Sequence, residues 1–294
     1  MSDVIASPSV RARAGEMGID LARRAAELGR KSIALEDLDG ASGAAAAPVP
    51  GDRSYWDVDH AAYGPVTTEP MSRIAQIAAK NLAAAQALIP AVTHHDRADV
   101  SAVEAMRARL KAEAEARGVR LTALAFHVKA LARALRAFPR FNASLSPDGE
   151  TLVLKGYVHI GIAVDTAHGL LVPVLRDADR KGLWAIAAEI GDLAARAQGR
   201  KLKAGEMGGA SMTISNLGGI GGTAFTPIVN PPEVAILCLT RTEPVTVLGP
   251  GGARPLAMVP LDLSYDHRVI NGADAARFLA YHARLIADPR RIML

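Results

Sequence analysis

Apolar residues recur at helical spacing in four segments beyond residue 70. These segments are 71–88, 101–117, 122–137 and 183–197. The second begins with Ser101 and Glu104, the residue types of a capping box, and Gly118 follows it as a stop signal. We therefore predict four amphipathic helices, and a fifth over 273–286.

Strand-like segments lie between these helices. Along 157–164 apolar residues alternate with others, and the turn DTAHG separates this segment from the apolar run LLVPVL. Alternation, a short turn and a second apolar run are the pattern of a β-hairpin. Further strands are predicted over 211–215, 234–239 and 258–265. A hairpin combined with long loops argues against a simple doubly wound parallel sheet, so we expect an α/β unit of another topology.

The first forty residues predict a small helical unit. Ser7 and Pro8 form a helix start, and Gly18 ends the helical apolar spacing that follows. A second short helix is predicted over 33–38. The unit is rich in basic residues, namely Arg11, Arg13, Arg23, Arg24, Arg30 and Lys31. This charge fits a solvated face and an acidic protein partner equally well.

Residues 41–64 are rich in alanine and proline and show no sustained periodicity. Such a composition is typical of a flexible linker. We therefore predict a helical domain over 5–40, a linker over 41–64 and a larger domain over 65–294.

Composition excludes several classes of protein. Half of the 294 residues are hydrophobic, 4% are aromatic, and the net charge is only +4, which argues against a nucleic-acid binder. The sequence has neither an apolar run of membrane length nor a signal peptide, so we expect a cytoplasmic protein with no membrane partner. Its one cysteine, Cys238, lies in the apolar run VAILCL, which predicts a buried side chain and no metal site.

The glycine-rich stretch NLGGIGGTAF at 216–225 follows a predicted strand. It lacks both the lysine of a phosphate-binding loop and the spacing of a dinucleotide site. We therefore expect its glycines to serve a tight turn or the close approach of another part of the backbone.

Most histidines are expected to be structural. The adjacent His94 and His95 are assigned to a surface or loop, and His127, His159, His168 and His282 to helices, a strand and a turn. His267 differs because it directly follows a predicted strand, where side chains face clefts and an imidazole can move protons. Asn271 lies four residues further on, and Gly272 would permit a sharp reversal into the last helix.

The segment DHRVINGADAARF around His267 resembles the H-x-x-x-D/N-G signature of the 2-oxo acid dehydrogenase acyltransferases. Further segments resemble the family in the same order, among them MSRIAQIAAKNL, FPRFNASLSPDG, YVHIGIAVDTAHGLLVPVLRD, SMTISNLGGIGGTAFTPIVNPPEVAIL and ADPRRIML. They cover 69–294 and are most similar to acetyltransferase cores of pyruvate dehydrogenase complexes. The resemblance implies a chloramphenicol-acetyltransferase-like α/β domain with a mixed sheet and flanking helices.

The resemblance also implies a reaction. Family members move an acetyl group between dihydrolipoyl-lysine and coenzyme A, or acetyl-CoA in reverse, without a metal. His267 matches the family's general base, and Ser215 matches the hydroxyl that stabilises the tetrahedral intermediate. Asn271 matches a position usually held by aspartate and would support the loop by hydrogen bonding. The family site lies between subunits, so His267 of one subunit is expected to face Ser215 of its neighbour.

Partners follow from the same resemblance. A homotrimer is expected, and the apolar tail 292–294 fits assembly into a 24-subunit core. The stretch ASPSVRARAGEMGIDL resembles a peripheral subunit-binding domain, so residues 5–40 would bind the decarboxylase or lipoamide dehydrogenase subunits. Only Gly29 and Arg30 remain of that domain's glycine-rich loop. The sequence holds no lipoyl domain, so the lipoyl group is expected on a separate lipoyl-domain protein, supplied in trans.

Two other functions fit the sequence. One is a non-catalytic core or scaffold subunit of a 2-oxo acid dehydrogenase complex, which the missing lipoyl sequence favours and the intact His267 motif opposes. The other is an acetyl-CoA-dependent transferase that acts on a small hydroxyl or amine acceptor, as antibiotic-modifying relatives do.

Overall fold

The computed structural model describes residues 4–16, 19–39, 58–249 and 251–293. The chain divides into two compact units, 1–69 and 70–294. Most of the linker segment predicted over 41–64, as well as Met17, Gly18 and Leu294, lies outside the described residues. A short 3₁₀ helix covers His60–Tyr63, within the first of these units.

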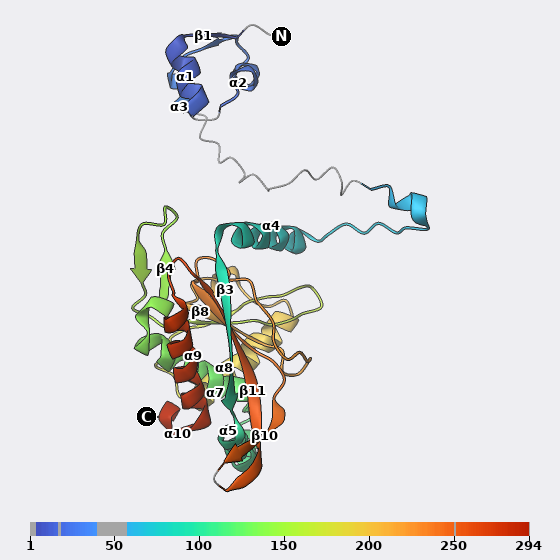
Figure 1. The fold of residues 1–294 in the computed structure, drawn as a ribbon. Helices are drawn as coiled ribbons and strands as arrows, with labels where there is room; N and C mark the ends of the chain where they lie inside the picture. Colours follow the sequence, from blue (N-terminus) through green and yellow to red (C-terminus); the bar gives the residue numbers. More distant parts are fainter. Residues whose placement is uncertain (1–3, 17–18, 40–57, 250, 294) are drawn as a thin grey trace. The chain divides into compact units, whose positions relative to one another are not determined.

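The N-terminal unit has three short helices, α1 (Pro8–Glu16), α2 (Leu21–Glu27) and α3 (Glu36–Asp39), and two paired parallel strands, β1 (Ile5–Ala6) and β2 (Ser32–Ile33) (Figure 1). Its small core consists of Val10, Ala14, Ala25, Ile33 and Leu38. The helix predicted over 33–38 is only partly right, because Ile33 is in strand β2 and the helix, α3, begins at Glu36. Helix α2 was not predicted, although Asp20 caps it by accepting hydrogen bonds from the amides of Ala22 and Arg23.

The larger unit is built on a mixed seven-stranded sheet. The strands are β3 (Ala91–Asp99), β6 (Ile160–Ile162), β7 (Val174–Leu175), β8 (Met212–Asn216), β9 (Ala235–Leu239), β10 (Glu243–Gly249) and β11 (Gly252–Asp266). Their order is β10-β11-β9-β8-β6-β7, and β3 pairs with β11. The β6–β8 and β8–β9 pairs are parallel and the others antiparallel, so the predicted mixed α/β fold and its hairpin, β6–β7, are confirmed.

The helices of this unit largely follow the predicted amphipathic segments. They are α4 (Arg73–Leu88), α5 (Ser101–Arg109), α6 (Lys111–Ala116), α7 (Ala123–Ala137), α8 (Leu183–Gln198), α9 (Gly272–Ala287) and α10 (Arg290–Met293). Short 3₁₀ helices cover Pro139–Phe141 and Ala204–Glu206, and a separate hairpin joins β4 (Ala143–Leu145) to β5 (Leu152–Leu154). Within the described parts of the chain, no helix combines the length and the apolar character needed to cross a membrane.

The helix predicted over 101–117 is divided at Leu110 into α5 and α6. The predicted capping box is also wrong. The Ser101 hydroxyl accepts a hydrogen bond from the amide of Ala257 on β11, at 3.0 Å, and Glu104 pairs with Arg107. Ser101 therefore ties the helix to the sheet, whereas a capping box would have closed the helix on itself.

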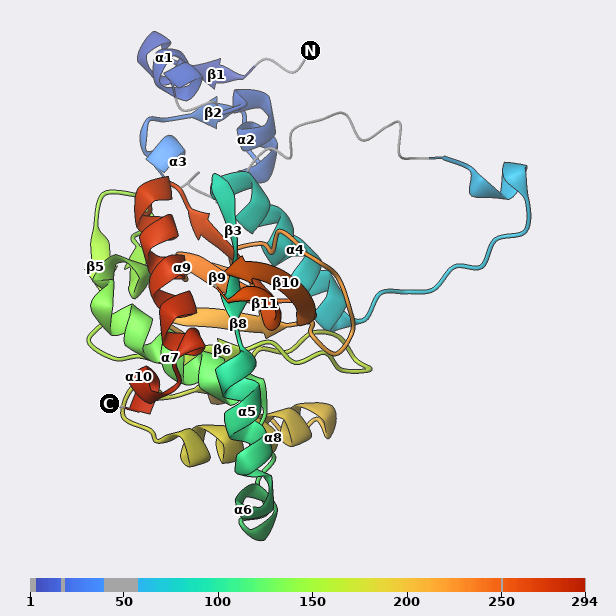
Figure 2. The same cartoon turned by 60° about the horizontal axis from the view of Figure 1, so that its bottom comes forward.

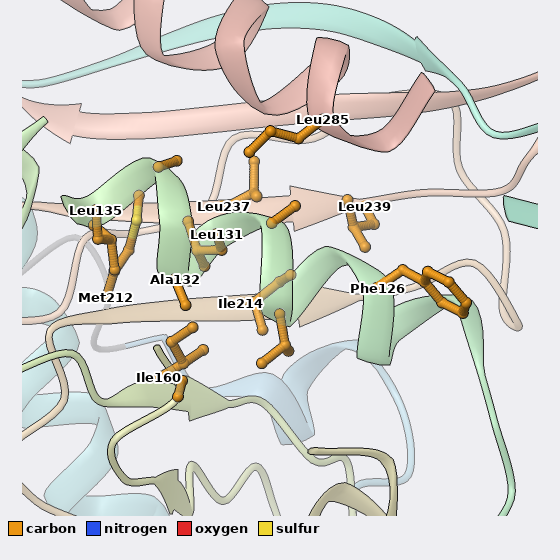
Figure 3. Packing of buried hydrophobic residues seen from close by; sticks show 14 of the residues in the cluster. Phe126, Leu131, Ala132, Leu135, Ile160, Met212, Ile214, Leu237, Leu239 and Leu285 are labelled. Atoms are coloured by element: carbon orange, nitrogen blue, oxygen red, sulfur yellow. The ribbon is translucent and has the colours of Figure 1, made fainter. Parts of the chain in front are cut away.

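One face of the sheet is apolar and carries helix α7 (Figure 3). Phe126, Leu131 and Leu135 of α7 are almost completely buried there. They pack with Ile160 of β6, Met212 and Ile214 of β8, Leu237 and Leu239 of β9, and Leu285 of α9. Helix α9 runs beside β3 and α7, as Figure 2 also shows. This core fixes the strands whose ends carry the candidate chemical groups.

Two histidines are buried between α7 and α9. His127 Nδ1 lies 3.0 Å from His282 Nε2, and the two rings stack with centroids 5.3 Å apart. Burial lowers the pKa of His127 to about 3. Burial, and then the neighbouring His127, lowers the pKa of His282 as well. Both imidazoles therefore remain neutral in the folded protein, which confirms the structural role expected for them.

This pair should make the protein less stable in acid. The unfolded chain binds protons at both histidines below a pKa of about 6.5 whereas the folded chain does not, so their contribution to stability is complete above that pH and decreases as the pH falls towards 3. The loss between pH 6 and 5 should be roughly 2 kcal/mol for the two residues. Urea unfolding measures this loss of unfolding free energy. The experiment compares the wild type with a His127→Gln/His282→Gln variant at pH 6 and at pH 5.

Glu233 has the opposite effect on the dependence of stability on pH. Burial raises the pKa of its carboxyl to about 7, so Glu233 favours the folded state at low pH and its contribution is lost as the pH rises through 7. Since Glu233 is present in both proteins, the difference between their curves isolates the histidines. If the unfolding free energies of the wild type and the double variant changed equally with pH, the destabilisation in acid could not come from these two histidines.

Candidate active site

His267 lies where β11 ends. It is the first residue after Asp266, it is exposed, and its ring centroid is 5.8 Å from that of Tyr265. The backbone on both sides is held, because the His267 amide donates to the Pro90 carbonyl at 3.1 Å and the buried Asp266 carboxylate binds the Arg268 guanidinium at 2.7 Å. The strand end predicted for His267 is therefore confirmed, with a fixed backbone and an accessible imidazole.

Asn271 caps the helix that follows. Its side-chain oxygen accepts a hydrogen bond from the Asp274 amide at 2.9 Å, so it fixes the start of α9. Gly272 is the first residue of α9 and is not in the left-handed conformation, so the predicted role of this glycine in a sharp reversal is wrong. The turn is instead formed over 267–269.

Ser215 lies near the end of β8 and is partly buried. It pairs with Cys238 of β9, a fully buried residue, as expected from the apolar run around that cysteine. The glycine-rich loop over 217–230 follows, and Gly222 in it has a left-handed φ of 88°. A Cβ on Gly218 would lie only 3.2 Å from the Thr240 carbonyl oxygen. Both roles expected for these glycines, a turn and a close approach, are confirmed.

A single chain does not bring Ser215 and His267 together. Ser215 pairs with Cys238, and Cys238 pairs with Asp262 of β11. His267 lies five residues beyond Asp262 along the same strand direction, about 17 Å at the rise of an extended chain. The two groups thus lie towards opposite ends of the strands, and a side chain cannot span that distance.

The face of the sheet that carries Ser215 is buried but polar. Thr93 Oγ1 lies 2.6 Å from Ser264 Oγ, and Thr213 donates a hydrogen bond to Glu233 at 2.9 Å. A Cβ on Gly161 would lie 2.6 Å from Thr213 Oγ1, so this position accepts only glycine without rearrangement. Hydroxyl and carboxyl groups therefore line the side of the sheet opposite the apolar core.

His94 and His95 lie on strand β3, so their assignment to a surface or loop is only partly right. His95 is exposed, but its Nδ1 is 2.6 Å from Oδ1 of the buried Asp262. Sequence reasoning could not find this pair, because the two residues are far apart in the chain and β3 has no apolar alternation.

A cavity of about 390 Å³ opens beside the start of the glycine-rich loop. Arg107, Arg120 and Arg241 line it, together with Asn216, the residue after Ser215. Glu104 holds the Arg107 guanidinium at 2.6 Å, and Arg241 donates to the Ile220 carbonyl at 2.9 Å. Three guanidinium groups around one cavity form a site suited to phosphate groups. Because these arginines come from separate segments, no local sequence motif predicts that they line one cavity.

Among the described residues there is no cluster of three or more histidine, cysteine or carboxylate side chains that could hold a metal ion.

Comparison with known proteins identifies the catalytic region. The model of the 2-oxoacid dehydrogenases acyltransferase (catalytic domain) family matches residues 63–294. The dihydrolipoyllysine-residue acetyltransferase component of the pyruvate dehydrogenase complex of Cupriavidus necator is 45% identical over 98% of this chain and 55% of its own length. That of Azotobacter vinelandii is 46% identical over 99% of this chain and 47% of its own length. The chain thus spans about half the length of these relatives.

Solved structures agree with the sequence matches. The dihydrolipoamide acetyltransferase of Azotobacter vinelandii superposes with a TM-score of 0.79 at 51% identity, over 81% of this chain and 98% of that chain. The cubic core of a pyruvate dehydrogenase multienzyme complex gives the same values. A 29% identical probable dihydrolipoamide acetyltransferase from Listeria monocytogenes superposes with a TM-score of 0.72, over 75% of this chain and 94% of that chain.

Proposed function

Because the chain belongs to the 2-oxoacid dehydrogenase acyltransferase family, we propose that it transfers an acetyl group between a dihydrolipoyl thiol and coenzyme A. The observation that carries this proposal is the accessible imidazole of His267 on a fixed backbone at the end of β11. A general base of this kind is what thioester exchange requires, because a thiol attacks only after losing its proton.

The proposed reaction uses two side chains. His267 takes the proton from the coenzyme A thiol, the sulfur attacks the acetyl thioester, and Ser215 donates a hydrogen bond to the negative oxygen of the tetrahedral intermediate. The intermediate then releases the dihydrolipoyl sulfur, which recovers a proton from the imidazolium. Reference pKa values of a thiol and an imidazole differ by about two units, so the first proton transfer costs roughly 2.7 kcal/mol. One well-placed oxyanion donor contributes a similar amount.

The solved Azotobacter vinelandii enzyme supports this choice of residues. That structure was studied for the role of a serine, a histidine and an asparagine in the catalytic mechanism. Those three residues have the same spacing along their chain as Ser215, His267 and Asn271 have here. In this proposal Asn271 keeps the His267 turn in place by capping α9.

The arginine-lined cavity is our proposed site for the phosphate groups of coenzyme A. Arg107 and Arg241 are braced by hydrogen bonds, so two of the three guanidinium groups are already oriented. The cavity borders Asn216, the residue after Ser215, and opens on the side of the sheet that carries α7. Phosphate recognition by guanidinium groups is strong because the hydrogen bonds are charge-assisted.

We further propose that the site forms between two copies of the chain, in a homotrimer that can build a larger core. Ser215 and His267 lie towards opposite ends of the strands of one sheet, so a complete site needs His267 from one copy and Ser215 from another. The 51% identical cubic core shows that such a fold can assemble in that relative. The described residues within 5–40 have a core of their own, and we propose 5–40 as the binding domain for a peripheral subunit of the complex.

Mixing two inactive variants tests both the activity and the shared site. His267→Ala and Ser215→Ala should each be inactive alone, with acetyl-CoA and free dihydrolipoamide as substrates. After the two are unfolded and refolded together, about a quarter of the sites should combine an intact His267 with an intact Ser215, if subunits mix at random. The measurement is acetyl transfer before and after mixing.

Other outcomes point to other functions. Absence of recovery after verified mixing would contradict a site shared between copies. Correctly assembled wild type that transfers no acetyl group to dihydrolipoamide would favour a scaffold subunit. Transfer from acetyl-CoA to small hydroxyl or amine acceptors in place of dihydrolipoamide would favour an acetyl-CoA-dependent transferase that acts on a small-molecule acceptor.

A further inference from the structure

A row of side chains crosses the sheet from Ser215 to strand β3. Ser215 pairs with Cys238, Cys238 pairs with Asp262, and Asp262 pairs with His95. Directly paired residues on neighbouring strands project their side chains from the same face. Asp262 therefore shares the face of Ser215 and lies two strands away, at about 10 Å.

Asp262 is held from two directions. Its Oδ1 lies 2.6 Å from His95 Nδ1, and its Oδ2 accepts a hydrogen bond from the Phe225 amide at 3.2 Å. The side chain of Asp262 is only 1% exposed, whereas that of His95 is 49% exposed. A buried carboxylate needs such partners, because water does not reach it to stabilise its charge.

The Phe225 amide belongs to the glycine-rich loop that follows Ser215. The loop, residues 217–230, contains no helix or strand, and its left-handed Gly221 and Gly222 leave its backbone few intrinsic constraints. Side chains from strand β11 and from the segment after β9 hold it at separate points. Arg241 donates to the Ile220 carbonyl at 2.9 Å, and Thr240 donates to the Thr223 carbonyl at 3.3 Å. Asp262 supplies the attachment at Phe225, further along the loop.

Cys238, between Ser215 and Asp262, remains a neutral thiol. Burial raises its pKa, and the nearby Asp262 carboxylate raises it further, while hydrogen bonding from Ser215 acts in the opposite direction. The carboxylate of Asp262 is thus next to an uncharged residue on β9, and the side-chain hydrogen bond that it receives comes from His95 on β3.

We propose that His95 and Asp262 are positioning residues for the acyl-transfer site: His95 fixes the Asp262 carboxylate, and Asp262 fixes the loop that adjoins Ser215. This inference rests on the proposed function for its effect on catalysis, but the attachment of the loop can be measured without any activity. His95, Thr223 and Ala224 also line one open cavity of about 520 Å³, so the pair forms part of the wall beside the loop.

Hydrogen–deuterium exchange on the full chain tests the attachment. In Asp262→Ala the Phe225 amide loses its acceptor, so its exchange should accelerate at least ~10-fold while exchange in α7 stays unchanged. Asp262→Asn retains an oxygen for that amide and should restore most of the protection. His95→Ala removes the partner that fixes the carboxylate and should give an intermediate acceleration.

Kinetics of the same variants test the positioning role. Asp262→Ala should lower kcat about 10-fold with the KM for acetyl-CoA unchanged, because a displaced loop disturbs the geometry at Ser215. Asp262→Asn should recover most of the lost kcat. His94→Ala is the matched control, since His94 is the neighbour of His95 on β3 and pairs with Leu263 rather than with Asp262. It should behave as wild type in both measurements.

Each contrary result has a distinct meaning. Unchanged Phe225 exchange in Asp262→Ala would refute the attachment, whatever the activity. Faster exchange with a normal kcat would refute the positioning role. Equal effects of His94→Ala and His95→Ala would refute the specific role of His95. If Asp262→Ala fails to fold, His95→Ala and Asp262→Asn still decide the question. An inactive wild type would refute the proposed function and leave the exchange test valid.

Discussion

Replacing His267 by alanine should lower kcat for acetyl transfer from acetyl-CoA to dihydrolipoamide by at least 10²-fold, the scale of a general base. The expected cause is loss of the group that accepts the thiol proton. The fold should survive, because the imidazole is exposed and the backbone bond to the Pro90 carbonyl does not involve the side chain. Initial rates at saturating substrate, together with an unchanged circular dichroism spectrum, measure the effect.

His168→Ala is the control for this experiment. His168 is an exposed histidine in the turn between β6 and β7, outside the proposed site, and its replacement should leave the rate close to that of the wild type. An equally active His267→Ala protein would exclude His267 as the base and would require another acceptor for the thiol proton.

Replacing Ser215 by alanine should lower kcat by about 10²-fold or more, because removal of one oxyanion donor costs roughly 3 kcal/mol. The KM for acetyl-CoA should change little, since the hydroxyl acts on charge that develops after binding. Ser215 is only partly buried and its neighbour Cys238 is a neutral thiol, so the substitution leaves no buried charge without a partner. Steady-state kinetics with both substrates separate the two parameters.

Ser264→Ala provides a matched serine control. Ser264 lies on the same face of the sheet and bonds to Thr93, away from the proposed chemistry. Loss of the hydroxyl should lower the free energy of unfolding by about 1 kcal/mol and leave kcat within a few-fold of the wild type. A rise in KM with an unchanged kcat in Ser215→Ala would show that the hydroxyl binds substrate rather than stabilising the intermediate.

Sequence reasoning found the elements in which apolar spacing is strong. Helix α7 and strand β9 follow their predicted bounds closely, because their buried residues recur at the period of each structure. Strand β3 was missed because THHDRAD presents polar side chains on both faces. Strand β10 escaped prediction because its side chains are mostly exposed, so pairing with β11 rather than burial maintains it.

In the candidate site, too, some residues could be predicted from local sequence and others could not. His267 could be singled out because a strand end, a turn and a helix start fall within a few residues of one another. The arginine cavity and the His95–Asp262 pair depend on contacts between distant segments, which no local pattern encodes. Hydrogen bonding across the sheet also changed the role of Ser101, whose hydroxyl binds the β11 backbone.

The placement of Ser215 and His267 towards opposite ends of the strands determines how a defective chain affects a mixed assembly. In the proposed arrangement every copy contributes to two sites, one through His267 and one through Ser215. A chain that carries defects in both residues therefore disables two sites when it joins an otherwise normal assembly. With half of the chains defective, only about a quarter of the sites would be intact at random mixing. Sites contained within one chain would leave half of them intact, so sharing the site doubles the loss.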